Sequence, residues 1–154
     1  MEMTKIADMT LQYRGQSDAP PTGKLGRYLG DGDGTVDGEA LRGRVVWSLF
    51  ENQGAMACDA SMIGRIETDE GAVIRFETLG FFQREADTQI WLLTAAIRFA
   101  TEHERYANFD GRTGWLTGQF DMQSYVHHYN LYLGTDEAAR LARTQNGEFH
   151  AAAD

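Results

Sequence analysis

The chain has 154 residues, with 23 acidic against 14 basic side chains and a formal net charge of -9. A chain of this length buries roughly two thirds of its unfolded surface in one core, so we expect a single domain over residues 1–154. The negative charge repels phosphate backbones and anionic lipids, and no apolar run approaches the roughly 20 residues that cross a bilayer. Nucleic acid and membranes are therefore not expected partners.

The cysteine content and the first residues of the chain indicate the cellular compartment of the protein. Cys58 is the one cysteine, so an internal disulfide is excluded. The sequence opens Met-Glu-Met-Thr-Lys without the apolar run of a secretory signal. We therefore expect a protein of the reducing cytoplasm.

The first half of the chain predicts strands separated by polar or glycine-rich connections. Partial alternation over 3–13 predicts an opening strand, and 16–24, which holds both prolines, predicts a surface loop. A strand pair is expected over 25–29 and 41–50, with a glycine-rich connection at 30–34. The apolar face of the strand over 41–50 consists of Leu41, Val45, Trp47 and Leu49.

The clearest element is a β-hairpin over 58–82, whose two alternating runs flank the turn Asp69-Glu70-Gly71. With Thr68 opposite Ala72, one face of the hairpin is apolar and the other is polar. The expected inner face comprises Ala60, Met62, Ile66, Ala72, Ile74 and Phe76. The expected outer face comprises Asp59, Ser61, Arg65, Glu67, Arg75 and Glu77.

The second half adds three strands and one helix. A strand over 90–99 is apolar on both faces, which indicates a central strand or one covered by a second subunit. A last pair is expected over 115–120 and 124–133, giving about eight strands in all. Thr135 caps a short expected helix over 136–143, and the following tail is expected to fray.

The acidic, glycine-rich stretch Asp31-Gly32-Asp33-Gly34 invites a calcium interpretation. The register of an EF-hand fails, however, because aligning Gly34 with the turn glycine puts Leu29 and Ala40 at ligand positions. We therefore expect a hairpin turn and no metal. Since no phosphate-binding motif follows the glycines either, we expect no cofactor.

Turn and strand signatures between residues 5 and 133 resemble a known family. They are Gly38, Gly43, Trp47, Asp59, Thr68-Asp69-Glu70-Gly71-Ala72, Gly80, Phe99, Thr101, Glu104-Arg105-Tyr106 and Gly118. On these residues the chain resembles domain-of-unknown-function family 3237. The resemblance implies a small, oligomeric antiparallel barrel and supplies no reaction. The expected fold is thus an all-β antiparallel barrel of about eight strands, calycin-like or allene-oxide-cyclase-like, with a short C-terminal helix.

The most promising chemistry lies in the last strand. Alternation places Tyr125, His127, Tyr129, Leu131 and Leu133 on one face. If the leucines point inward, His127 does too, and it can then act as a general acid or base beside an oxyanion-stabilising tyrosine. The alternative is a core histidine satisfied by a neighbouring hydroxyl or carbonyl group.

Other residues could shape a pocket. We assign Trp47, Trp91, Phe99 and Trp115 to the interior, where they either wall a pocket for a ring-containing molecule or fill the barrel. Arg98 interrupts an apolar strand, so it either reaches water at the rim or needs an anionic partner. That partner would be Asp59 or a substrate carboxylate.

The sequence therefore predicts a cofactor-free barrel that binds a small hydrophobic or aromatic ligand, forms a homodimer or higher homo-oligomer, and acts as an isomerase, cyclase or lyase. The substrate class is an aromatic or polyketide-like carbonyl compound. Candidate catalytic residues are His127, Tyr129 and Tyr125, and candidate substrate-binding residues are Trp47, Arg98, Trp115 and Asp59. A non-catalytic carrier and a filled-barrel interaction protein are the alternatives.

Overall fold

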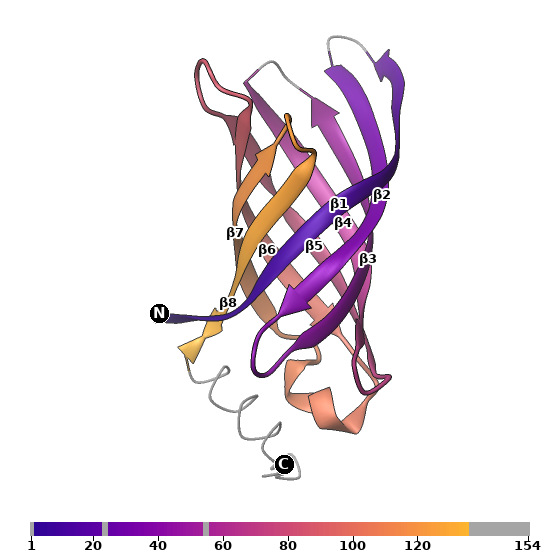
Figure 1. Ribbon diagram of the computed structural model, residues 1–154, viewed down its shortest axis with the longest axis vertical. Coiled ribbons are helices and arrows are strands. Elements are labelled where there is room, and N and C mark those ends of the chain that lie inside the picture. Colours follow the sequence, from indigo (N-terminus) through magenta and orange to yellow (C-terminus); the bar gives the residue numbers. More distant parts are fainter. Residues whose placement is uncertain (1, 23–24, 54–55, 136–154) are drawn as a thin grey trace.

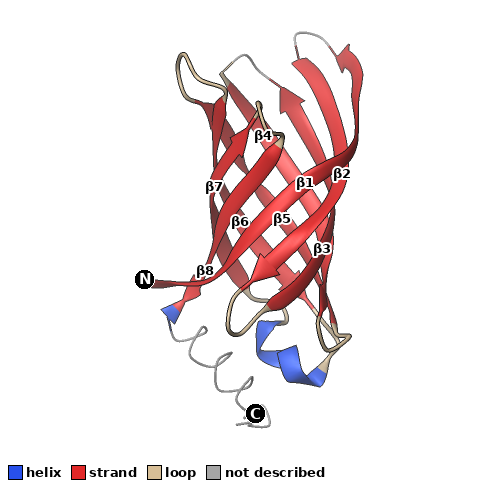
Figure 2. Cartoon of the chain, in the orientation of Figure 1, coloured by secondary structure: helices blue, strands red, loops and turns tan. Residues whose placement is uncertain are grey.

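The computed structural model describes residues 2–22, 25–53 and 56–135, and it shows a closed barrel of antiparallel strands (Figure 1; Figure 2). The strands are β1 (Met3–Thr22), β2 (Leu25–Asp37), β3 (Arg42–Gln53), β4 (Ala57–Thr68), β5 (Val73–Arg84), β6 (Ile90–Ala100), β7 (Thr113–Asp121) and β8 (Val126–Gly134). Each strand pairs with its neighbours along the chain, and β1 also pairs with β8. The expected all-β, eight-stranded antiparallel barrel is thereby confirmed. The expected helix over 136–143 lies outside the described residues.

The two ends of the barrel differ. The connections after β5 and β7 lie at one end, called the upper end here, and the short 3-10 helix η1 (Glu104–Phe109) lies at the other (Figure 1). Phe109 of η1 is buried, and its ring stacks on Phe99 with 4.1 Å between centroids. This packing makes η1 part of the core at the lower end.

The central hairpin formed as predicted. The Thr68 amide donates to the Ala72 carbonyl at 2.9 Å, and Gly71 takes a φ of 87° that glycine adopts without strain. Ile66 lies opposite Ile74 in the ladder, and both side chains are buried. The alternation thus places an apolar face of β4 and β5 inside the barrel, while the outer face carries charged side chains together with Ile63, Leu79 and Phe81.

The loop expected over 16–24 is wrong over its described part, because β1 continues to Thr22 and pairs with β2. Beyond Gln12, β1 has left β8 and has only one neighbouring strand. Pro20 and Pro21 fall where the β1–β2 register shifts, between Ala19 and Thr22. Proline is tolerated at such a bulge because its missing N–H breaks no regular ladder bond.

The hairpin turn expected at 30–34 is also wrong, since these residues lie inside β2 and the connection to β3 falls at 38–41. Close packing explains why glycine occurs within β2. A Cβ atom on Gly32 would lie 1.9 Å from the Gln12 carbonyl oxygen and 2.7 Å from Cζ2 of Trp47. Gly32 therefore makes room for the indole of Trp47 inside the barrel.

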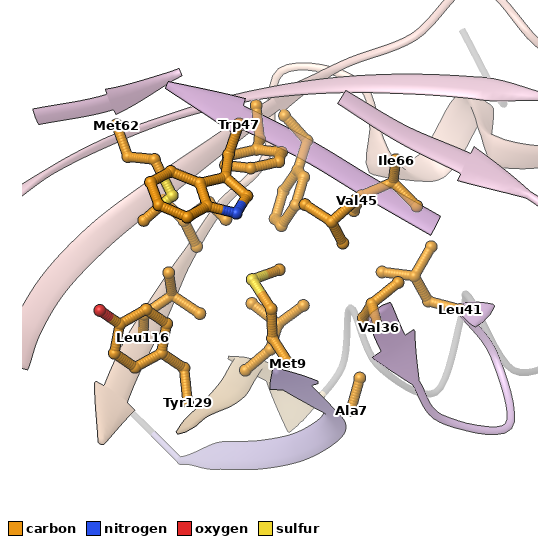
Figure 3. Packing of buried hydrophobic residues seen from close by; sticks show 14 of the residues in the cluster. Ala7, Met9, Val36, Leu41, Val45, Trp47, Met62, Ile66, Leu116 and Tyr129 are labelled. Carbon is orange, nitrogen blue, oxygen red and sulfur yellow. The ribbon is translucent and has the colours of Figure 1, made fainter. Parts of the chain in front are cut away.

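Buried apolar side chains from the strands pack together in the interior, as Figure 3 shows for part of the cluster. Trp47 from β3 and Tyr129 from β8 extend into this core, together with Met9 from β1 (Figure 3). Leu41, Val45, Trp47 and Leu49 are all buried, as their spacing predicted. The buried polar side chains among the described residues are Glu51, Thr68, Thr78, Thr101 and His127.

We expect Gly32→Ala to lower the free energy of unfolding by about 2 kcal/mol, because the new methyl group has no space between the β1 backbone and Trp47. Gly15→Ala is the matched control. A Cβ there meets only the end of the Asp31 side chain, at 2.8 Å, which can turn aside. Urea unfolding followed by circular dichroism measures both variants, and equal midpoints would contradict this account.

Candidate functional site

The candidate site is a group of aromatic side chains around His127 at the upper end of the barrel. His127 and Tyr129 alternate with exposed or half-buried residues along β8, so both point into the barrel. His127 is 1% exposed, and Leu131 and Leu133 are buried on the same face. The expectation that His127 follows the leucines inward is confirmed.

Four aromatic rings from other strands surround the imidazole of His127. The ring of Phe120 from β7 stacks on it, with 4.4 Å between centroids and 23° between planes. Tyr13 lies at 5.2 Å, Trp47 at 5.6 Å and Phe82 at 6.1 Å. The imidazole therefore sits in an aromatic cage that belongs to β1, β3, β5 and β7.

Tyr125 forms an outer layer of this cage. It lies in the β7–β8 turn with a φ of 59°, and its ring packs 5.6 Å from both Tyr13 and Phe120. With 39% of its surface exposed, Tyr125 lies between the cage and solvent. The predicted trio of His127, Tyr129 and Tyr125 is thus assembled at one end, with Tyr125 at the mouth.

A hydrogen bond joins Nδ1 of His127 to the hydroxyl group of Tyr129. Within the described part of the chain, Nε2 of His127 is buried and has no hydrogen-bond partner. Trp47 differs, since its indole N–H donates to the Asp33 carbonyl oxygen at 3.0 Å. Trp47 is therefore satisfied as a wall of the cage, whereas His127 keeps one open position.

The hydrogen-bond partners available to His127 and Tyr129 identify the tautomer of His127. If Tyr129 donates to Nδ1, Nε2 carries the imidazole proton, and that N–H is the one unsatisfied group. If Nδ1 donated instead, both the tyrosine O–H and the Nε2 lone pair would lack partners. The first arrangement leaves fewer buried groups unsatisfied, so the imidazole presents an Nε2–H donor to the cage.

Burial keeps both groups of this pair neutral. Desolvation, with a smaller contribution from His128, lowers the pKa of His127 from 6.5 to about 3. Desolvation also raises the pKa of Tyr129 well above its usual value, and the charges of Glu51 and Cys58 act in the same direction. At neutral pH the imidazole is thus a hydrogen-bond donor and a weak base.

Glu51 is a buried acid at this end of the barrel that the sequence analysis did not single out. It is 8% exposed and accepts a hydrogen bond from Sγ of Cys58 at 3.9 Å. Burial first, and then the charges of Glu51 and Asp59, raise the pKa of the Cys58 thiol to about 12. The spacing of Glu51 with Trp47 and Leu49 could have placed it inward.

Three predicted site residues lie on the outside of the barrel, which corrects their assignment. Trp115 is 44% exposed and faces outward between the inward Gly114 and Leu116, so it does not wall the interior. Because these inward neighbours include a glycine, local alternation did not distinguish the two faces of β7.

Arg98 and Asp59 belong to the outer face as well. Arg98 points to solvent and forms an ion pair with Glu77 on the next strand, with Nη2 and Oε1 2.6 Å apart. Asp59 is exposed opposite Phe81. Neither side chain reaches the cage, so neither orients a ligand there. Of the two positions considered for Arg98, the structure shows the one in which its side chain reaches water.

No family model and no curated protein matches the chain. Solved structures share its fold. A protein of unknown function from Clostridium acetobutylicum superposes with a TM-score of 0.74 at 15% identity, over 86% of this chain and 98% of that one. A β-barrel-like protein from Acinetobacter baumannii gives 0.75 at 15%, over 85% and 94%. An enzyme from Penicillium herquei gives 0.63 at 17%, over 84% and 93%.

At these identities the likeness extends to the fold alone. The resemblance to family 3237 stays a prediction. Among the described residues, no three His, Cys, Asp or Glu side chains converge as a metal site would require. In the same part of the chain, no helix has the length and apolar character needed to span a membrane.

The buried imidazole predicts a specific pH dependence of stability. His127 stays neutral in the folded protein down to about pH 3, whereas in the unfolded chain it takes up a proton near its ordinary pKa of 6.5. The unfolded state therefore binds more protons in this window, and stability falls as the pH falls through it. Relative to His127→Phe, the wild type should lose about 2 kcal/mol between about pH 6 and pH 4.5.

Urea unfolding across this pH range measures the difference. The matched control is His103→Gln, at an exposed histidine near η1, whose curve should run parallel to that of the wild type. A His127→Phe curve parallel to the wild type would show that the imidazole is not held neutral by burial.

Proposed function

We propose that the chain binds a small aromatic carbonyl compound in the cage, with the Nε2–H of His127 donating a hydrogen bond to the carbonyl oxygen. The buried donor without a partner carries this proposal. Leaving such a group unsatisfied costs about 1–3 kcal/mol, which a bound acceptor would recover. The surrounding rings favour a flat, ring-containing ligand.

Charge at the upper end favours a neutral ligand. The buried polar side chains of the described residues include Glu51 but no lysine or arginine. A substrate carboxylate would enter next to the buried acid Glu51, and the two negative charges would repel each other. A ketone, aldehyde or quinone avoids this cost and still offers an acceptor to His127.

The same geometry supports cofactor-independent isomerase, cyclase or lyase chemistry on such a carbonyl compound. A neutral imidazole donor stabilises the negative charge that develops on the oxygen when a neighbouring C–H bond is broken. Because its pKa lies near 3, His127 is a poor acceptor for that proton. We assign the proton to the carboxylate of Glu51, which would return it to another atom of the intermediate. These roles replace the predicted ones, in which His127 moved the proton and a tyrosine held the oxyanion.

The second candidate function is a carrier that binds the same ligand without turnover. Its support is the low pKa of His127 together with the burial of the imidazole beneath Tyr13 and Tyr125. In either case a ligand reaches Nε2 only after these mouth rings move. The fold shared with a Penicillium herquei protein described as an enzyme adds support to the catalytic alternative.

A matched ligand pair tests the hydrogen bond. We expect wild-type protein to bind 2-acetylnaphthalene about tenfold more tightly than 2-ethylnaphthalene, because only the ketone accepts from His127. In His127→Phe the preference should disappear. Trp115→Phe, which alters an exposed aromatic side chain on the outer face, should retain it. Isothermal titration calorimetry measures all of these affinities, and a preference that survives in His127→Phe would overturn the assignment.

Turnover separates the enzyme from the carrier. Native mass spectrometry after incubation with a small-molecule extract of the source cells identifies a bound compound, whose conversion is then followed. An enzyme predicts that Glu51→Gln retains binding but loses turnover, and that His127→Phe slows turnover by about 100-fold or more. Stoichiometric binding without conversion would establish the carrier. A folded His127→Phe variant with the parental rate would refute the proposed chemistry.

A further inference from the structure

The outer surface of the barrel carries a continuous patch of large apolar side chains over β3 to β7. Its members are Phe50, Ile63, Leu79, Phe81, Leu92 and Trp115, called the apolar face here. The ladder makes the patch continuous, because Phe50, Leu79 and Trp115 lie in one row across the strands, with only Ser61 and Ala96 between them. This face lies outside the barrel and shares no side chain with the cage.

The exposure of these side chains is unusual for a surface that faces only water. Leu79 is 72% exposed, Phe81 66% and Ile63 63%. Taking roughly 200 Å² for each large side chain, the apolar face exposes about 650 Å², at or above the largest patches of typical monomers. With its polar rim it approaches the roughly 800 Å² that each partner buries in a standard protein interface.

A groove lies beside this patch on the side nearer η1. It has a volume of about 540 Å³, and exposed side chains that line it include Ser48, Ile63, Arg65, Glu77 and Arg98. Along β5, Leu79 lies between the groove residue Glu77 and the protruding Phe81. The face thus has a projection on one side of Leu79 and a hollow on the other. A two-fold axis at Leu79 would place the projection of each copy against the hollow of the other, so the face is complementary to itself.

The two edges of the apolar face also differ in charge. On the groove side, Arg65, Arg75 and Arg98 lie near Glu67, Glu102 and Glu77, respectively, so that edge is close to neutral. On the other side Asp59 and Glu85 are exposed acids. In a chain with a net charge of -9, the neutral edge is where a second acidic copy meets the least repulsion. Turning one copy over brings the acids of one edge to the arginines of the other.

We propose that a second copy of this chain covers the apolar face in a two-fold symmetric dimer. The axis runs across the strands at the level of Leu79, so that Phe81 of each protomer enters the groove of the other. In this symmetric arrangement Asp59 of one protomer lies opposite Ile63 of the other, one outward position from Arg65. This dimer depends on neither the cage nor its ligand.

Oligomeric state tests the proposal. Sedimentation velocity of the full chain should give a dimer at roughly 50 µM, and Leu79→Lys should weaken association about 30-fold or more, as for a residue at the centre of an interface. Val73→Lys is the matched control, since it alters an exposed apolar residue on the same strand outside the face and should leave the dimer intact. Because Leu79 is mostly exposed, thermal unfolding should show that the Leu79→Lys protomer folds normally.

A charge exchange tests the arrangement. Asp59→Arg alone and Arg65→Asp alone should each weaken the dimer, and the double variant should restore it, because the opposite charges again meet across the axis. A monomeric wild type at this concentration, or a dimer that survives Leu79→Lys, would overturn the proposal. Failure of the double variant to recover would exclude the two-fold arrangement.

Discussion

Closure of the sheet by the β1–β8 pairing is the constraint on which the rest of the structure depends. It converts the two faces of one sheet into an inside and an outside, so every second residue along each strand loses contact with water. Apolar side chains gain from this burial, while any polar side chain on an inward position must find a hydrogen-bond partner. The core of Met9, Leu116 and Ile66 and the isolated donor on His127 are two consequences of the same closure.

The candidate site shows how burial decides chemistry. Histidine is usually considered a proton carrier near neutral pH, but the cage around His127 removes the water that would stabilise the imidazolium. What remains is a neutral donor whose direction is set by Tyr129. A site of this kind is suited to polarising a carbonyl group, and in the proposed chemistry the proton is taken by Glu51, the buried acid at the same end of the barrel.

The outer surface of the barrel determines how the protein can associate. A closed barrel has no free edge along its paired length, so association by edge pairing is suppressed and the faces of the sheet are what remain for contact. The exposed side chains of Leu79 and Phe81 lie on such a face, beside the groove lined by Glu77. The proposed ligand site and the proposed dimer interface therefore lie on opposite faces of the same sheet.

Local patterns were sufficient wherever one face of a strand was apolar and the other polar. The β4–β5 hairpin, the inward row of Trp47 and the inward position of His127 all follow from alternation, because the side-chain period of a strand is independent of its neighbours. Pairing between strands decided the structure of the segments that contain proline and several glycines. Proline and glycine indicate loops in isolation, yet the register shift at Ala19–Thr22 and the indole over Gly32 place them in strands.

The outward position of Trp115 and the pairing of Arg98 with Glu77 belong to the same class of tertiary effects. So does the meeting of β1, β3, β5, β7 and β8 side chains around one imidazole. Alternation along this chain determined which side of β3, β4, β5 and β8 is buried, since the side-chain period of a strand depends on local geometry alone. Only the closed barrel decided which buried side chains meet and which polar atom is left without a partner, because those contacts join residues far apart in sequence.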